Sequence, residues 1–294
     1  MLPPSLPRLL AGALLCLAAL AAGCDQDARS NAPTASEPAA AVTQLIDDLR
    51  GNDLAAYARH AVPADLHAQL ATAWDEGRTV WPLTELPLDR QLGGFITALA
   101  APDAERKLLA AYRVQFAGAH GELRTAATTL GLFATQYVNR EAEYSPVERD
   151  HYAQLIRALS QWGQRAPLGD PARARRAVPR LAAAARTTGL AGEDTLRRTG
   201  MEHSLARLGP FFGQLREVAK REYGLDFEPA LAGARVRLAE QTGDRARVRI
   251  QYDLAGVPVD AFVLMERHAG HWYMSDLLRR ARLEASGPAA VATR

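Results

Sequence analysis

The sequence predicts an α+β protein, with a mainly α-helical body followed by a C-terminal four-stranded antiparallel meander packed on a helix. Apolar side chains recur at helical spacing through most of residues 40–225. After Gly233 the apolar period changes from 3.6 to 2, which is the period of a half-buried strand. The 294 residues are 48% hydrophobic and 23% charged, as in a globular chain large enough to bury a core.

The first 24 residues have the pattern of an export signal. Arg8 precedes an unbroken apolar run, Leu9 to Ala22, which is shorter than the ~20 residues that span a bilayer as a helix. Small residues then lead through Gly23 to Cys24. The combination resembles the signal peptide and lipobox of bacterial lipoproteins, and it delimits residues 1–23 as the signal.

That resemblance implies cleavage between Gly23 and Cys24 and a diacylglycerol on the Cys24 thiol, with fatty acids such as palmitate as the membrane anchor. Cys16 leaves with the signal, so Cys24 is the one cysteine of the mature chain. The expected location is the bacterial cell envelope, facing the periplasm. Asp25 resembles an inner-membrane retention mark, but the choice between inner and outer membrane stays open. An ordinary secretory signal cut near Ala22 is the alternative.

Residues 24–39 are expected to form a flexible tether, because Ser, Thr, Asn and Pro are frequent there and no apolar period exists. The helical domain is expected over residues 40–225. Its apolar stripes fall within 42–49, 108–116, 123–137 and 152–162.

Prolines and caps set several expected helix ends. Ser145-Pro146 and Asp170-Pro171 each combine an N-cap with proline at the first helical position. Pro179 is expected to kink or divide the second of these helices, and Pro210 to start a last long helix that Gly224 stops. The prolines between Thr79 and Leu92 predict an irregular loop.

The β-meander with its closing helix is expected over residues 226–286, and residues 287–294 form a tail. Strands are predicted around 236–238, 247–254, 257–266 and 272–275, with a helix from Leu277 onward. Tight turns join them, so the sheet should be antiparallel, with one face on a helix and one in water.

The chain ends resemble the nuclear transport factor 2-like cone fold. The residues that carry the resemblance are the first predicted helix, the polar turn Gly51-Asn52-Asp53 after it, and His271-Trp272-Tyr273 leading into Asp276-Leu277. That family uses its fold both for small-ligand pockets and as a non-catalytic module, so the resemblance does not choose a function.

Common catalytic motifs are absent: the P-loop, the dinucleotide fingerprint, the zincin motif and the nucleophile elbow. No cofactor and no metal are expected. The weak metal candidates are His268 and His271, on the turn between the last two strands with Asp276 nearby; the alternative is a pair of solvated turn histidines.

Four arginines crowd one predicted helix and form a candidate binding strip for an acidic partner: Arg173, Arg175, Arg176 and Arg180. The alternative is a solvated polar helix. The formal net charge is only +2, which gives no general attraction to nucleic acid, so none is expected as a partner.

The sequence leaves two functions open. The first is a lipid-anchored envelope lipoprotein that acts without catalysis, as a binding, scaffold or inhibitor protein with an envelope protein partner. The alternative is a small-ligand- or substrate-binding protein, including an enzyme. Its pocket would lie between the sheet and the helix starting at Pro210, lined by Tyr252, Phe262 or Trp272.

Overall fold

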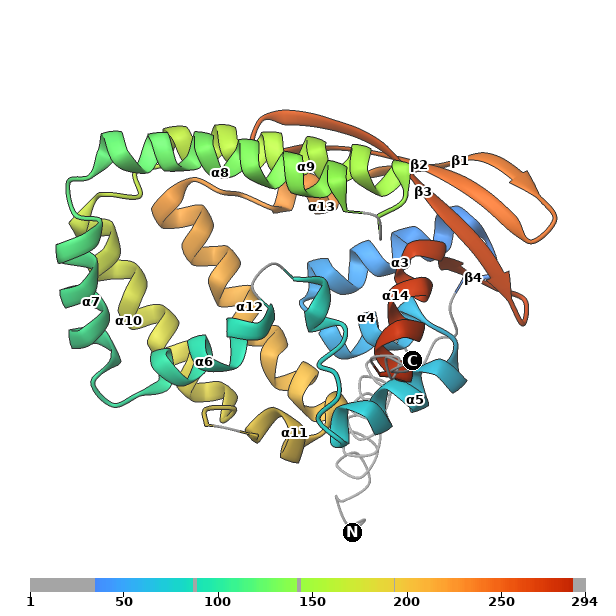
Figure 1. Cartoon of the computed structure of the whole chain (residues 1–294), viewed down its shortest axis with the longest axis horizontal. Helices are drawn as coiled ribbons and strands as arrows, with labels where there is room; N and C mark the ends of the chain where they lie inside the picture. Colours follow the sequence, from blue (N-terminus) through green and yellow to red (C-terminus); the bar gives the residue numbers. More distant parts are fainter. Residues whose placement is uncertain (1–34, 87–88, 142–143, 193, 288–294) are drawn as a thin grey trace, which may run out of the picture. The chain divides into compact units, whose positions relative to one another are not determined.

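The computed structural model describes residues 35–86, 89–141, 144–192 and 194–287 (Figure 1). The predicted signal, Cys24 and most of the predicted tether lie outside the described residues, as do residues 288–294 of the tail. The described residues group into one compact unit, so the helices and the sheet share one body. The predicted α+β class, helices first and a sheet last, is confirmed.

The first helices follow in close succession from the start of the described chain. They are α3 (Pro38–Gly51), α4 (Leu54–Ala61), α5 (Ala64–Asp75), the short 3₁₀ helix η1 (Leu83–Glu85), α6 (Asp89–Ala100) and α7 (Ala104–Gln115). The next set continues to the sheet: α8 (His120–Arg140), α9 (Pro146–Arg165), α10 (Pro171–Thr188), α11 (Thr195–Thr199), α12 (Met201–Tyr223) and α13 (Glu228–Ala232). Figure 1 shows α8 and α9 lying side by side, which their contacts confirm.

The C-terminal sheet has the strand order β1-β2-β3-β4, and every neighbouring pair is antiparallel. The strands are β1 (Arg235–Thr242), β2 (Arg245–Leu254), β3 (Val257–His268) and β4 (His271–Met274), followed by α14 (Ser275–Ser286). Because β4 is short, it pairs only with the end of β3. Nearer the start of β3, the side-chain amide of Gln154 on α9 makes two hydrogen bonds to the backbone of Asp260. It accepts from the Asp260 N–H and donates to the Asp260 carbonyl, each at 2.9 Å.

Two apolar clusters attach helices to the inner face of the sheet, the face that carries Val248 and Ile250. Ala41 and Val42 of α3 pack against β2, β3 and Trp272 of β4. Ala158 of α9 and Ala230 of α13 pack against the start of β3 and the end of β2. The largest cluster joins α4, α5, α12 and α14 around the fully buried Trp74 and Trp81.

Partly buried ion pairs also connect α14 to the helical region. The guanidinium of Arg280 pairs with Glu85 of η1, at 2.7 Å, and with Glu148 of α9. Glu148 is the N3 residue of a capping box with Ser145, so the predicted cap at Ser145 both starts α9 and orients this carboxylate.

The expected start of the last long helix is wrong. Pro210 does not start the last long helix: α12 begins at Met201, and Pro210 lies inside it. The buried side chains of Leu205, Leu208 and Phe211 lie on both sides of the proline, and their packing outweighs the backbone hydrogen bond that proline cannot donate. The predicted end at Gly224 is confirmed by its left-handed φ of 70°.

The loop expected over residues 79–92 is also shorter than predicted. Helix α6 begins within it, at Asp89, and buries Ile96 and Leu99 on one face. Pro179 likewise lies within one uninterrupted helix, α10, so it does not divide that element. Helix α3 includes Pro38 and Ala39, at the end of the predicted tether.

Candidate functional site

An apolar pocket lies between the inner face of the sheet and helices α3, α9 and α13. The cavity has a volume of about 300 Å³, at the lower end of the range typical of ligand pockets. We call it the sheet pocket. Its lining side chains are Val42, Leu45, Ile46, Leu49, Tyr57, His151, Leu155, Phe227, Ala230, Leu231, Ala234, Ile250, Tyr252, Leu254 and Met274.

Helical and strand periodicity place these side chains around one hollow. On α3 the lining residues follow the spacing i, i+3, i+4 and i+7, which keeps them on one face of the helix. On β2 the lining residues Ile250, Tyr252 and Leu254 are two apart, which keeps them on one face of the sheet. The apolar stripe of α3 and the alternating apolar residues of β2, both predicted from the sequence, therefore form two walls of the sheet pocket.

One polar pair interrupts the apolar lining. Nε2 of His151 lies 2.7 Å from the hydroxyl of Tyr252, and the two rings meet edge to face. Burial lowers the pKa of His151 and raises the pKa of Tyr252. Both side chains are therefore neutral near pH 7, and the pair offers hydrogen-bonding groups without a net charge.

Tyr57 of α4 is the third polar residue of the lining. Burial, with a smaller contribution from the Glu85 carboxylate, raises its pKa, so this phenol also stays neutral. None of the lining residues of the sheet pocket is an Asp, Glu, Lys or Arg. The pocket accordingly suits a neutral ligand, because a buried charge without a partner is costly.

Leu49 marks the side of the sheet pocket nearest the solvent. Its side chain is 38% exposed, whereas every other lining residue is buried or half-buried. Leu49 stands on the last turn of α3, directly before the turn to α4. We therefore treat Leu49 as the mouth of the pocket.

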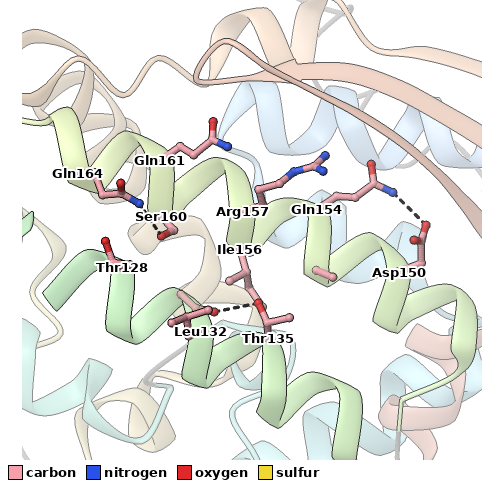
Figure 2. A pocket seen from close by; sticks show the side chains of 12 residues that line it. Thr128, Leu132, Thr135, Asp150, Gln154, Ile156, Arg157, Ser160, Gln161 and Gln164 are labelled. Carbon is pink, nitrogen blue, oxygen red and sulfur yellow. Dashed lines mark hydrogen bonds between the residues drawn. The ribbon is translucent and has the colours of Figure 1, made fainter. Parts of the chain in front are cut away.

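A second hollow, the α8–α9 groove, is larger and more polar. Its volume is about 560 Å³, and Figure 2 shows Thr128, Leu132 and Thr135 of α8 facing glutamines and Ser160 of α9. Some of its polar groups already bond to the protein: Gln164 donates to Ser160, and Ser160 donates to the carbonyl of Ala127. Only two neighbouring helices form the groove, so it is a weaker candidate than the sheet pocket.

The structure brings one of the three predicted pocket residues to the pocket. Tyr252 lines it, whereas Trp272 is buried in the cluster between α3 and the sheet. Phe262 pairs with Arg249 across β2 and β3, on the face opposite Tyr252, and its ring carries the guanidinium of Arg247 at 3.7 Å. Helix α12, which contains Pro210, contributes no lining residue.

Sequence reasoning missed the helical half of the pocket. His151 and Leu155 belong to a stripe that the sequence does show, but nothing in the sequence says that α9 lies against β2. Helix α13 is only five residues long, too short to give a periodic signal.

Most of the predicted arginine strip is engaged within the body. Arg176 and Arg180 pair with the buried carboxylate of Glu222 on α12, at 2.8 and 3.2 Å. Arg173 donates to the carbonyl of Glu222 at 2.6 Å and pairs with Asp170. Arg175 is exposed. Three of the four strip residues thus join α10 to α12 or cap α10.

The metal candidates do not converge. Nε2 of His268 lies 2.8 Å from Glu266 and 3.2 Å from the Arg282 guanidinium. Asp276 instead accepts from Ser145 at 3.1 Å. Within the described ranges, no group of three His, Cys, Asp or Glu side chains is arranged to hold a metal ion.

None of the helices in the described part of the chain is both long and apolar enough to span a membrane. No family model, no curated protein and no solved structure matches the chain. The function is therefore inferred from the residues of this chain alone.

Proposed function

We propose that the protein is a lipid-anchored, periplasm-facing envelope lipoprotein whose body binds a small, neutral, mainly apolar ligand in the sheet pocket. The observation that carries the proposal is the His151–Tyr252 pair, in a lining that is apolar apart from this pair and Tyr57. Ligand pockets commonly combine apolar walls with a few placed polar groups.

The lining defines the chemistry of the ligand. Apolar surface removed from water contributes about 25 cal/mol per Å², which favours an aliphatic or aromatic body. A hydroxyl, amide or ester on that body would bond to His151 or Tyr252. A carboxylate or ammonium would lose its hydration without gaining an ion pair, since no charged side chain lines the sheet pocket.

Titration with a neutral fluorescent probe, N-phenyl-1-naphthylamine, tests the proposal. The probe should bind the wild-type chain and be displaced by 1-decanol much better than by decanoate. Leu49→Trp should weaken probe binding about tenfold or more, because the indole fills the mouth. Leu283→Trp, which enlarges a leucine 57% exposed on α14, is the matched control and should leave binding unchanged. Equal binding by both variants would place the probe elsewhere.

The anchor is tested separately, by metabolic labelling with palmitate. The wild-type chain should take up the label and Cys24→Ala should not, because that substitution removes the predicted acceptor thiol. Labelling of Cys24→Ala at the wild-type level would contradict the anchor and would leave the pocket proposal standing.

A protein partner is the second candidate function, as scaffold, assembly accessory or enzyme inhibitor. Helix α8 favours it, because four of its large apolar side chains are more than 60% exposed: Leu130, Leu132, Phe133 and Tyr137. Leu130, Phe133 and Tyr137 follow the spacing i, i+3 and i+7, so they share one face of the helix, and exposed apolar patches mark interaction sites. A pull-down from solubilised envelope should then recover one partner in stoichiometric amount from the wild type and lose it with Leu130→Ser/Phe133→Ser.

A further inference from the structure

The outer face of the sheet, opposite the sheet pocket, carries a concentration of arginines. Strands β1 and β2 place five of them on this face, since these residues alternate with the buried side chains of the inner face. We call this set the arginine face: Arg235, Arg237, Arg245, Arg247 and Arg249.

Most of these charges have no neutralising partner in the body. Arg235, Arg237 and Arg245 are exposed, and none forms an ion pair with a residue that the structure describes. Arg249 pairs with Asp260, and Glu266 of the same face pairs with His268 and Arg282. Glu240 stands opposite Arg247, and Asp253 also lies on this face; neither forms an ion pair with a residue that the structure describes. The four arginines without an ion pair outnumber these two carboxylates, so the remaining charge of the face is positive.

Two details indicate that an anion belongs there. Arg237 and Arg249 stand directly opposite each other on β1 and β2, and like charges in this arrangement repel. Asp260 compensates Arg249, whereas Arg237 has no ion-pair partner among the described residues. The guanidinium carbon of the partly buried Arg247 lies 3.7 Å from the centroid of the Phe262 ring, a cation–π contact that leaves its positive charge on this face without an ion pair. Bound phosphates would neutralise Arg237 and its exposed neighbours Arg235 and Arg245.

The length of chain between Cys24 and the sheet indicates which anionic partner the arginine face meets. The described chain begins at Ala35, whose carbonyl accepts a hydrogen bond from the Trp272 N–H of β4 at 3.4 Å. The residues from Cys24 to Ala35 span at most about 36–40 Å when extended, at about 3.3–3.6 Å per residue. A lipid on Cys24 would thus hold this sheet close to the bilayer. Half-buried Phe262 and Leu264 of β3 stand directly opposite Arg249 and Arg247, so apolar side chains border the arginines, as suits a headgroup interface.

We propose that the arginine face docks the body onto anionic phospholipid headgroups at the membrane surface. The choice of a membrane rather than an acidic protein rests on the proposed anchor, whereas the anionic chemistry rests on the sheet alone. Docking would turn the outer face of the sheet toward the lipid and leave the sheet pocket on the opposite face.

Vesicle sedimentation with the chain from Asp25 to Arg294 tests the proposal without the anchor. This chain keeps every described residue of the compact unit. It should bind phosphatidylcholine vesicles that contain phosphatidylglycerol about tenfold or more better than phosphatidylcholine alone, and high salt should abolish the difference. Arg235→Gln/Arg237→Gln/Arg245→Gln should remove that preference. Arg124→Gln/Arg140→Gln/Arg175→Gln, which loses the same charge at exposed positions on other elements, should keep it.

Circular dichroism establishes that both triple variants are folded, and probe binding reports on the sheet pocket independently. Equal vesicle binding by the two triple variants, or equal binding of the wild type to neutral and anionic vesicles, would overturn the proposal. Arginine-face-dependent binding to polyglutamate without binding to anionic vesicles would also overturn it and would identify an acidic polypeptide as the occupant.

Discussion

Glu222 of α12 is a buried carboxylate that engages two exposed arginines of α10 in ion pairs within the body. It is 4% exposed, and its carboxylate accepts the guanidinium groups of Arg176 and Arg180. In the sequence, nothing distinguishes Arg176 and Arg180 from their neighbour Arg175. Arg175 is exposed and forms no ion pair with a residue that the structure describes. The difference lies in a carboxylate more than forty residues away, which no local pattern reports.

We expect Glu222→Ala to lower the free energy of unfolding by about 1–3 kcal/mol, because two ion pairs between α10 and α12 are lost. Arg176 and Arg180 are about half exposed and can rehydrate, which limits the loss. Arg175→Ala should change stability by less than about 0.5 kcal/mol. Urea unfolding of both variants checks the prediction, and a similar loss in each would contradict it.

His151 gives a pH dependence of stability. Burial lowers its folded-state pKa below the ordinary value of 6.5, so the unfolded chain takes up a proton first as the pH falls. The stability linked to neutral His151 is therefore complete above about pH 6.5 and is lost as the pH falls toward the folded-state pKa.

Urea unfolding at pH 7.5 and 5.5 measures this effect. His151→Gln should lose less stability than the wild type between the two pH values, since glutamine does not titrate. His203→Gln, at an exposed histidine of α12, should behave like the wild type. A wild-type pH dependence in His151→Gln would show that other groups account for it.

At the scale of elements, the sequence predicts what local chemistry controls. The capping box at Ser145 starts α9, and the change of period after Gly233 marks the sheet. Sequence patterns give the wrong position for boundaries that packing controls, such as the start of α12 upstream of Pro210. There the buried surface of the whole helix outweighs the local preference of one proline.

The turn between α3 and α4 shows the same dependence on packing. Asn52 has a left-handed φ of 58°, and Arg216 of α12 donates to its side chain and to the carbonyls of Leu49 and Arg50. A Cβ on Gly209 of α12 would lie 2.1 Å from the carbonyl oxygen of Asn52. Gly209 is therefore needed for α12 to approach this turn.

Gly209→Ala should consequently destabilise the fold by about 1–3 kcal/mol, against the gain of about 1 kcal/mol expected for alanine in an unobstructed helix. Gly51→Ala is the matched comparison, because a Cβ at that helical position meets nothing within 4 Å, and it should be neutral or stabilising. Thermal unfolding distinguishes the two. A stabilised Gly209→Ala variant would mean that α12 and the turn are farther apart than described.

At the scale of the whole molecule, the candidate site combines predictable and unpredictable parts. Strand alternation puts Tyr252 on the covered face of the sheet, and helical spacing puts Leu45 and Leu49 on one side of α3. The contact of His151 with Tyr252 spans about a hundred residues of sequence. It depends on how α9 packs on the sheet, a long-range arrangement that periodicity does not encode. The resemblance to the nuclear transport factor 2-like fold stays a prediction.

Whether the sheet pocket holds a neutral ligand can be measured by native mass spectrometry of the protein purified in mild detergent from its own envelope. The wild type and Leu283→Trp should carry one small neutral molecule that Leu49→Trp lacks. Its dissociation should leave the mass of the protein and its acyl chains. A wild type without any adduct, or an adduct that Leu49→Trp retains in full, would contradict ligand binding in the sheet pocket.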